Sequence, residues 1–453
     1  MRILLISTYE LGRQPFGLAS PAAWLRRAGC EVECADTTRH KLSESAVKQA
    51  DAIAFYLPMH TATRIALPII DRVRQLNPAV RLGAYGLYAP LNEKLLRDHG
   101  VEFLAGGEFE QALVDWVNQS KIKNQKSKID LVRLDRLTFL TPDRSGLPPL
   151  KQYARLSMPD ASERICGYTE ASRGCKHLCR HCPIVPVYGG KFRIVQQEVV
   201  LSDIRQQVES GAQHITFGDP DFFNGPAHAL AIVRALHAEW PRLSYDVTIK
   251  IEHLLKHAGG ISVLRDTGCA FVTSAVESVD NHVLTLLDKG HTRADFGAVA
   301  TNFREIGLAL APTFVAFTPW TSLETYLDLL NTVSDRNLVD NVPPVQWTLR
   351  LLVTSGSPLL DLPEMRPHLR GFDAARLCHR WLHPDPRVDA LQQAIDAAVQ
   401  ELTVRKFGRQ EIFDHVRALA QQAIDGDDDV PMPDVPVLAD RATVPYLTEP
   451  WYC

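Results

Sequence analysis

Three cysteines that lie close together are the residues of this chain with the clearest chemical potential. Cys175, Cys179 and Cys182 fall within eight residues, directly after Gly174. Cysteine thiolates are the usual ligands of [4Fe–4S] clusters, and this spacing can fill three corners of one cube. No fourth cysteine lies nearby, because Cys166 is nine residues upstream. The pattern therefore predicts a cluster with one iron open to a further ligand. Such an open iron is typical of a catalytic cluster rather than of a purely structural one.

Two other sites could use the same three thiols. A zinc ion would need a fourth ligand, for which His177 or His181 is available, but no second ligand pair stands at zinc-finger spacing. A cluster that only carries electrons is the second alternative. The residues around the cysteines decide between these interpretations.

The spacing C-x-x-x-C-x-x-C resembles the cluster motif of the radical SAM superfamily. This resemblance implies that the open iron binds S-adenosylmethionine (SAM) and that one electron cleaves it, releasing a 5′-deoxyadenosyl radical. In this family an aromatic residue usually precedes the last cysteine and lies against the adenine. His181 holds that position here.

Two further segments resemble SAM-binding parts of the same family. The first is Gly218, Asp219, Pro220 and Asp221, where the family has a short Gly/acidic segment that binds the SAM amino group. The alternative is an ordinary turn, because Gly-Asp-Pro is good turn chemistry. The second, residues 268–278, is similar to a strand of cobalamin-type radical SAM enzymes. This similarity implies that Ser274 and Glu277 hold the ribose or carboxylate of SAM, either directly or through Lys250 of the preceding strand.

Length, charge and cysteine usage limit the class of protein. A chain of 453 residues is too long for one core, so we expect two or three domains. Its net charge of −4 argues against a nucleic-acid backbone as the main partner. Nine irregularly spaced cysteines do not form a secreted disulfide framework, and a cluster needs reduced thiols, so the cytoplasm is expected. We find no signal peptide and no apolar run of membrane-spanning length.

Residues 1–118 alternate apolar runs with helical patterns. This predicts a doubly wound, Rossmann-like (flavodoxin-like) α/β domain with parallel strands at Arg2–Ser7, Glu31–Cys34, Ala52–Tyr56, Arg81–Tyr85 and Glu102–Leu104. Ligands of such sheets bind at the carboxyl ends of the strands.

This first domain resembles the cobalamin-binding domain that precedes the barrel in many radical SAM proteins. The resemblance implies corrinoid contacts at the strand ends, namely Thr8, Pro58, Gly86, Gly107 and Glu108. The Asp-x-His-x-x-Gly motif, whose histidine ligates cobalt in other cobalamin enzymes, is absent. A domain of this fold that binds no corrinoid is therefore the alternative.

A polar, turn-rich stretch at residues 119–160 is expected to be a linker. Residues 161–365 repeat the strand–helix pattern and predict a partial (β/α)6 radical SAM barrel with the cluster loop after its first strand. Its expected strands are Cys166–Ala171, His214–Gly218, Tyr245–Ile251, Ala270–Ala275, Ala309–Ala316 and Val345–Leu352. A helical region should follow over 366–425, carrying His379 and His383 one turn apart. Residues 426–453 are expected to form an extended, acidic, Pro-rich tail.

The chain ends in Trp-Tyr-Cys453 after Thr-Glu-Pro, which is similar to the tail of the CUAEP/CCAEP-tail radical SAM (seleno)proteins. The resemblance implies a catalytic role for Cys453 as part of a redox or metal-binding tail, and a stop read at a selenocysteine codon is one hypothesis for the end of the chain.

Together these features predict a radical SAM enzyme that acts on an unidentified substrate. Its cofactors would be a [4Fe–4S] cluster and SAM, together with cobalamin if the reaction is a methylation. A flavodoxin- or ferredoxin-type protein would donate the electron. The alternatives are a cobalamin-independent radical modification and an iron–sulfur protein without SAM cleavage.

Overall fold

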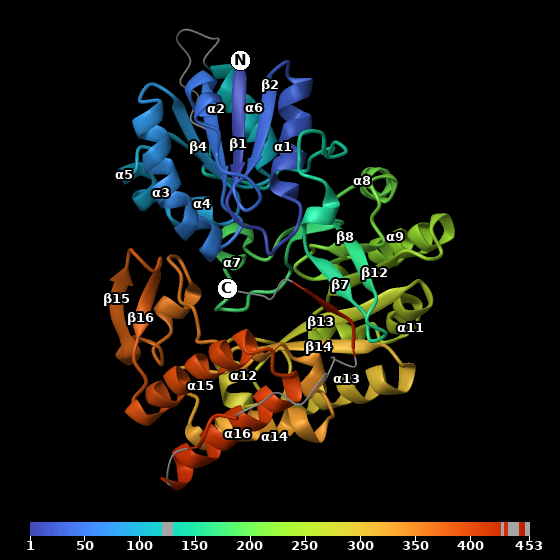
Figure 1. Ribbon diagram of the computed structural model, residues 1–453, viewed down its shortest axis with the longest axis vertical. Coiled ribbons are helices and arrows are strands. Elements are labelled where there is room, and N and C mark those ends of the chain that lie inside the picture. The colour runs from blue at the N-terminus through green and yellow to red at the C-terminus, as the bar shows by residue number, and fades with distance from the viewer. Residues whose placement is uncertain (120–129, 427–429, 434–443, 449–453) are drawn as a thin grey trace.

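The computed structural model describes residues 1–119, 130–426, 430–433 and 444–448. Figure 1 shows the first α/β domain packed above a second, curled sheet, with the C-terminal helices beneath that sheet. No helix in these ranges is both long enough and apolar enough to cross a membrane.

The first domain contains a six-stranded parallel sheet in the order β2-β1-β3-β4-β5-β6. The first five strands in this order form the flavodoxin-like arrangement. Its strands are β1 (Arg2–Ser7), β2 (Glu31–Asp36), β3 (Ala52–Tyr56), β4 (Arg81–Tyr85), β5 (Phe103–Gly107) and β6 (Val132–Arg133). Its helices are α1 (Phe16–Arg27), α2 (Glu44–Gln49), α3 (His60–Leu76), α4 (Tyr88–Leu91), α5 (Glu93–Asp98) and α6 (Phe109–Gln119).

Alternation along the strands builds one core on each face of this sheet. In β1, Leu4 and Ile6 belong to one core, whereas Ile3 and Leu5 belong to the other. Successive side chains of a strand point to opposite faces, so a strand covered on both sides is apolar throughout. The predicted doubly wound fold of the first domain is therefore confirmed.

The second sheet has the order β14-β13-β12-β11-β8-β7-β17, and its first five members run parallel. The strands are β7 (Arg155–Ser157), β8 (Glu163–Thr169), β11 (His214–Phe217), β12 (Ser244–Thr248), β13 (Cys269–Glu277), β14 (Ala309–Phe314) and β17 (Tyr446–Leu447). The helices that follow its strands are α8 (Gln197–Glu209), α9 (Pro226–Glu239), α10 (Ile251–Lys256), α11 (Gly259–Asp266), α12 (Asn281–Leu286), α13 (Arg293–Ile306) and α14 (Leu323–Asp335). This curled, partial barrel confirms the predicted fold class of the central region.

The expected sixth barrel strand differs from the prediction. Residues 345–352 begin in a 3-10 turn, Pro344–Trp347, and the only pairing described for them is a bridge between Phe317 and Arg350. Proline fixes φ and lacks the N–H that a strand would donate, so the two prolines at 343 and 344 favour the turn. The barrel therefore has five parallel strands and an irregular sixth unit.

The C-terminal region is helical from residue 386 onward, in α15 (Pro386–Val404) and α16 (Arg409–Asp425). Before these helices a hairpin forms from β15 (Leu369–Asp373) and β16 (Cys378–Trp381). The prediction of a helix there was wrong, and His379 lies in a strand rather than one helical turn before His383. The His379 N–H donates to Val353 O, and such tertiary pairing overrides the weak helical pattern.

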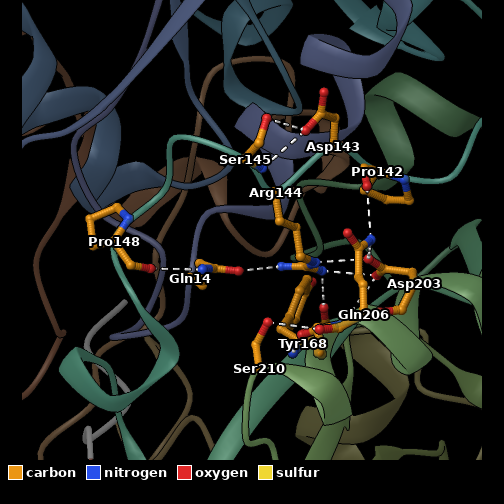
Figure 2. Close-up of polar contacts among 11 residues, drawn as sticks. Gln14, Pro142, Asp143, Arg144, Ser145, Pro148, Tyr168, Asp203, Gln206 and Ser210 are labelled. Atoms are coloured by element: carbon orange, nitrogen blue, oxygen red, sulfur yellow. Dashed lines mark hydrogen bonds and ion pairs between the residues drawn. The ribbon is translucent and has the colours of Figure 1, made fainter.

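The segment expected to be a linker contributes to both sheets, through β6 and β7. Within it, the buried Arg144 joins the two domains (Figure 2). Its guanidinium donates to both oxygens of Asp203 on α8, at 2.7 and 2.8 Å, and to Gln14 Oε1 of the first domain at 2.7 Å. A bidentate Arg–carboxylate pair of this kind fixes orientation as well as distance.

The remaining elements are short and lie near the cluster loop or between larger units. They are β9 (Ser172–Gly174), α7 (Val185–Tyr188), β10 (Phe192–Ile194) and the 3-10 turns Leu150–Gln152, Phe222–Asn224, Val339–Asn341, Pro358–Asp361 and Arg366–His368.

Candidate active site

The three cysteines lie on the loop between β9 and α7, at the carboxyl-end rim of the barrel. Gly174 opens the loop with a φ of +74°, and a Cβ there would lie 2.3 Å from the Tyr188 ring. The Lys176 N–H donates to Asn224 Oδ1 at 3.1 Å, and the Arg180 N–H donates to Leu287 O at 3.0 Å. The loop is thus held at its start and its middle by the barrel.

The spread of the thiols favours a cluster over a single zinc ion. Four ligands at about 2.3 Å from one zinc would lie roughly 3.8 Å apart. Among the described His, Cys, Asp and Glu side chains, the only trio whose ligand atoms lie within 4.8 Å of one another is His177, Asp221 and His253. The three cysteines are not such a trio, and a cube holds its cysteines farther apart because each binds a different iron.

Burial raises the pKa of the Cys175 thiol to about 11 and that of Cys182 to about 12. Such thiols stay protonated until a metal, whose positive charge favours the thiolate, replaces the proton.

Glu277 lies at the end of β13 with both His181 and Lys289 beside it. Its Oε1 is 3.0 Å from His181 Nε2 and 3.2 Å from Lys289 Nζ. Burial alone would raise the pKa of Glu277, but the neighbouring Lys289 and then His181 outweigh it and lower this pKa to about 2. The residue has a φ of +66°, at a bulge between β13 and β14. Backbone strain at a non-glycine residue is common at functional sites.

The cation beside Glu277 was predicted to be Lys250, and the structure corrects this. Lys250 Nζ lies 3.3 Å from Glu252, whereas the buried Lys289 pairs with Glu277. The sequence segment Leu-Leu-Asp-Lys-Gly-His contains Lys289, but the turn that brings it back under β13 is a tertiary feature.

Several buried polar atoms near Glu277 have no partner among the described residues. They are Ser274 Oγ, on a fully buried side chain, His181 Nδ1 and His291 Nδ1. Buried polar groups are nearly always hydrogen-bonded, so orphans of this kind point to a missing ligand. The set mixes donors and acceptors: the Ser274 hydroxyl can donate, whereas His291 Nδ1 accepts, because Nε2 of that ring donates to Val276 O. SAM offers hydroxyl and amino donors as well as carboxylate and purine acceptors.

The segment after β11 has a different arrangement from the simple ammonium-binding edge that was predicted. Gly218 packs so closely that a Cβ would lie 1.7 Å from the Tyr168 hydroxyl. The Asp219 carboxylate accepts from the Ala171 N–H at 2.9 Å and the Ser172 hydroxyl at 2.6 Å, so its side chain holds the cluster loop. Burial raises the pKa of Asp219 to about 7 despite these donors.

Pro220 lines a cavity of about 1030 Å³ together with Gly218 and Asp219. The cavity occupies the inner face of the barrel sheet and is bordered by α15, α16 and the C-terminal segment around β17 (Tyr446–Leu447). Asp246, Thr273, Thr313, Gln346 and Gln400 bring polar groups into it. Its volume is at the upper end of ordinary ligand sites, so it can hold a substrate beside SAM.

The five residues predicted to contact cobalamin lie at the carboxyl edge of the first sheet, as expected. Thr8, Gly86, Gly107 and Glu108 are buried there by protein, and Pro58 is half-buried. The Thr8 hydroxyl donates to Ala62 O at 2.7 Å. Glu108 pairs with Arg173 at 3.3 Å and accepts from the Tyr188 hydroxyl at 3.4 Å. At Glu108 the edge is thus already engaged by Arg173 and Tyr188 of the barrel's cluster segment.

Cys453, predicted as a catalytic residue, lies outside the described residues. Two residues that the sequence did not single out are Arg173 and Lys289, which are buried cations on either side of the cluster loop. The sequence signal available for Arg173 was its position two residues before the first cysteine of the cluster motif.

Comparison with known proteins agrees with this geometry. The family model described as "Radical SAM superfamily" matches residues 169–330. The chain is 22% identical over 307 residues to the tRNA-2-methylthio-N(6)-dimethylallyladenosine synthase of Haemophilus influenzae (strain PittEE), covering 64% of this chain and 60% of that enzyme. It is 23% identical to the hopanoid C-3 methylase of Methylococcus capsulatus (strain ATCC 33009 / NCIMB 11132 / Bath), covering 70% and 64%. The chain thus spans less than two thirds of the length of these relatives.

Two solved structures share the fold. The cobalamin-dependent SAM radical enzyme OxsB, solved with aqua-cobalamin and SAM, superposes with a TM-score of 0.71 at 12% identity, over 93% of this chain and 71% of that one. The radical SAM methyltransferase TsrM from Kitasatospora setae gives 0.65 at 15% identity, over 87% and 88%. The central domain, residues 169–330, is therefore a radical SAM domain, and the cysteine loop lies inside the matched range.

Proposed function

We propose that this protein cleaves SAM reductively and uses the resulting radical on a substrate held in the barrel cavity. The observation that carries the proposal is the buried, unpartnered His181 Nδ1 within the loop of Cys175, Cys179 and Cys182, which leads to Ile184 at the edge of the barrel cavity. When bound, the cluster supplies the electron that converts SAM to methionine and a 5′-deoxyadenosyl radical.

The chain's own residues would hold the reactants and exclude water. Cys175, Cys179 and Cys182 provide three thiolates for the cluster. Ser274 can donate a hydroxyl proton to a SAM oxygen, and Glu277 fixes the ring of His181 through Nε2 so that Nδ1 faces the ligand side. The C-terminal helices border the cavity and shield part of it, which limits the access of solvent to a reactive radical.

The test is anaerobic incubation of cluster-reconstituted protein with SAM and dithionite, with 5′-deoxyadenosine measured by chromatography. The Cys175→Ala/Cys179→Ala/Cys182→Ala variant should lose this product. Cys378→Ala, a half-buried cysteine on β16, is the matched control and should keep it. Cleavage retained without the three thiols would overturn the site. A cluster that assembles but yields no 5′-deoxyadenosine would favour an electron carrier.

Two reaction outcomes follow from different observations. The engagement of Glu108 by Arg173 and Tyr188 favours a radical modification without cobalamin. Likeness in fold to OxsB and TsrM favours cobalamin-dependent methylation as the second candidate. Corrinoid content after anaerobic purification with cobalamin supplied separates them: none supports the first, and one per chain supports the second.

The proposed reaction also needs a one-electron donor, for which we propose a flavodoxin- or ferredoxin-type protein. Replacing dithionite by such a donor with its reductase should sustain 5′-deoxyadenosine formation.

A further inference from the structure

A second cluster of ligating side chains lies beside the cysteine loop and is unrelated to the thiols. His177 belongs to the loop itself, between Cys175 and Cys179. Asp221 follows β11, and His253 lies in the first turn of α10. Their atoms Nε2, Oδ2 and Nδ1 all lie within 4.8 Å of one another.

The three converging atoms are buried and have one another as close polar neighbours. Asp221 Oδ2 lies 2.7 Å from His253 Nδ1 and 3.5 Å from His177 Nε2. Two ring nitrogens and one carboxylate oxygen that converge in this way form a ligand set for a metal ion.

The other atoms of these side chains are held in place from outside. Asp221 Oδ1 accepts from the Phe223 N–H at 3.1 Å, which turns Oδ2 toward the histidines. His177 Nδ1 lies 3.5 Å from Glu252 Oε2, and Glu252 is in turn paired with Lys250. A carboxylate behind a ligating imidazole is the usual outer partner of a metal-bound histidine.

We propose that His177, Asp221 and His253 bind one divalent first-row transition ion. Two imidazoles and one carboxylate with open positions suit Zn²⁺ or Fe²⁺. Around such an ion, ligand atoms about 2.0–2.1 Å from the metal lie roughly 3.3 Å apart. The His177–Asp221 separation already matches, and the His253–Asp221 pair opens by about 0.6 Å on binding.

The ion would fasten the cluster loop to the barrel. His177 comes from the loop, whereas Asp221 and His253 come from the ends of two neighbouring strands. One ion therefore links three segments and fixes the loop independently of the cluster. This structural role does not depend on SAM cleavage. The ion at this site is distinct from the irons of the cluster.

Zinc binding by a protein without the cluster thiols tests the proposal. In the Cys175→Ala/Cys179→Ala/Cys182→Ala background, equilibrium dialysis with Zn²⁺ followed by elemental analysis should give one zinc per chain. Adding His253→Gln should lower the affinity by more than about 100-fold, beyond the effect usual for an outer partner. His257→Gln, one turn further along, is the matched control and should leave it unchanged. Zinc that is lost with the thiols, or kept in His253→Gln, overturns the proposal.

Folding and metal identity are checked separately. Saturating Zn²⁺ should raise the thermal midpoint of the parent and of His257→Gln, and not that of His253→Gln. If His253→Gln does not fold, Asp221→Asn replaces it with the same expectation. Zinc-edge absorption of the variant without the three cluster thiols should show nitrogen and oxygen neighbours without sulfur, and a sulfur shell there would overturn the assignment. Elemental analysis of the same variant as purified shows which ion the site takes, because no cluster iron is present.

Discussion

Arg173 Nη2 lies 2.7 Å from Glu110 Oε1, so the last residue but one before the first cluster cysteine is clamped to the first domain. The same guanidinium reaches Glu108 at 3.3 Å and Glu170 at 2.7 Å, and all of these groups are largely buried. The cluster loop is therefore positioned by a carboxylate cage from both domains. Burial raises the pKa of Glu108 to about 7 although Arg173 opposes the shift.

Replacing Arg173 by Met should both destabilise the protein and loosen the cluster loop. The change leaves buried carboxylates without their cation, which typically costs about 3–5 kcal/mol. Urea unfolding of the apo protein and iron content after reconstitution measure the two effects. Arg155→Met is the control, because its pair with Glu163 is exposed and should contribute at most about 1 kcal/mol. Equal urea midpoints for the two variants would contradict a stabilising role for the buried contacts between Arg173 and the three carboxylates.

Ser274→Ala should weaken SAM binding without weakening the fold. The Ser274 hydroxyl is fully buried and has no partner among the described residues, so removing it costs the protein no internal hydrogen bond. Losing one hydrogen bond to SAM should raise its Kd by roughly 3- to 10-fold. Calorimetric titration of the cluster-loaded protein measures this, and the thermal midpoint should stay the same or rise. An unchanged Kd together with a lowered midpoint would make Ser274 a purely structural residue.

Periodicity in the sequence predicted most strands of both sheets, because buried parallel strands are short, apolar and bounded by turns. The bounds of β1, β3 and β4 agree with the prediction to the residue. The hairpin of β15 and β16 and the irregular sixth barrel unit were missed, because pairing across the fold decides both. Within the site, the cysteine loop and Glu277 were identifiable, but the partners that set their electrostatics come from distant segments, as Arg173 and Lys289 illustrate.

Lys289→Met should be far more damaging than Lys250→Met. Lys289 is the buried cation beside Glu277, and without it that carboxylate keeps only His181. We expect a loss of about 3 kcal/mol, with urea unfolding as the measurement. Lys250 is also buried, but its partner Glu252 is half-exposed and can be solvated when the pair is lost, so this replacement should cost less than that of Lys289. The reverse order would restore Lys250 as the partner of Glu277.

His291→Gln should remove part of the loss of stability in mild acid. Burial, followed by the nearby Lys289, lowers the pKa of His291 from 6.5 to about 4. Between these pH values the unfolded chain binds a proton that the folded protein refuses, so stability falls as pH decreases from about 6.5 to 4. The full shift of 2.5 units corresponds to at most about 3 kcal/mol. Above pH 6.5 this histidine contributes no pH dependence.

The measurement is the urea midpoint at several pH values between 7 and 4.5, in the variant without cluster thiols and with a chelator present. Neither acid loss of a cluster nor metal release then interferes. Glu277 stays ionised throughout this range because its pKa is about 2. His291→Gln should flatten the pH dependence, whereas His282→Gln, an exposed histidine on α12, should leave the slope of the parent. Parallel slopes for all three proteins would mean that His291 accepts a proton in the folded state as readily as in the unfolded chain.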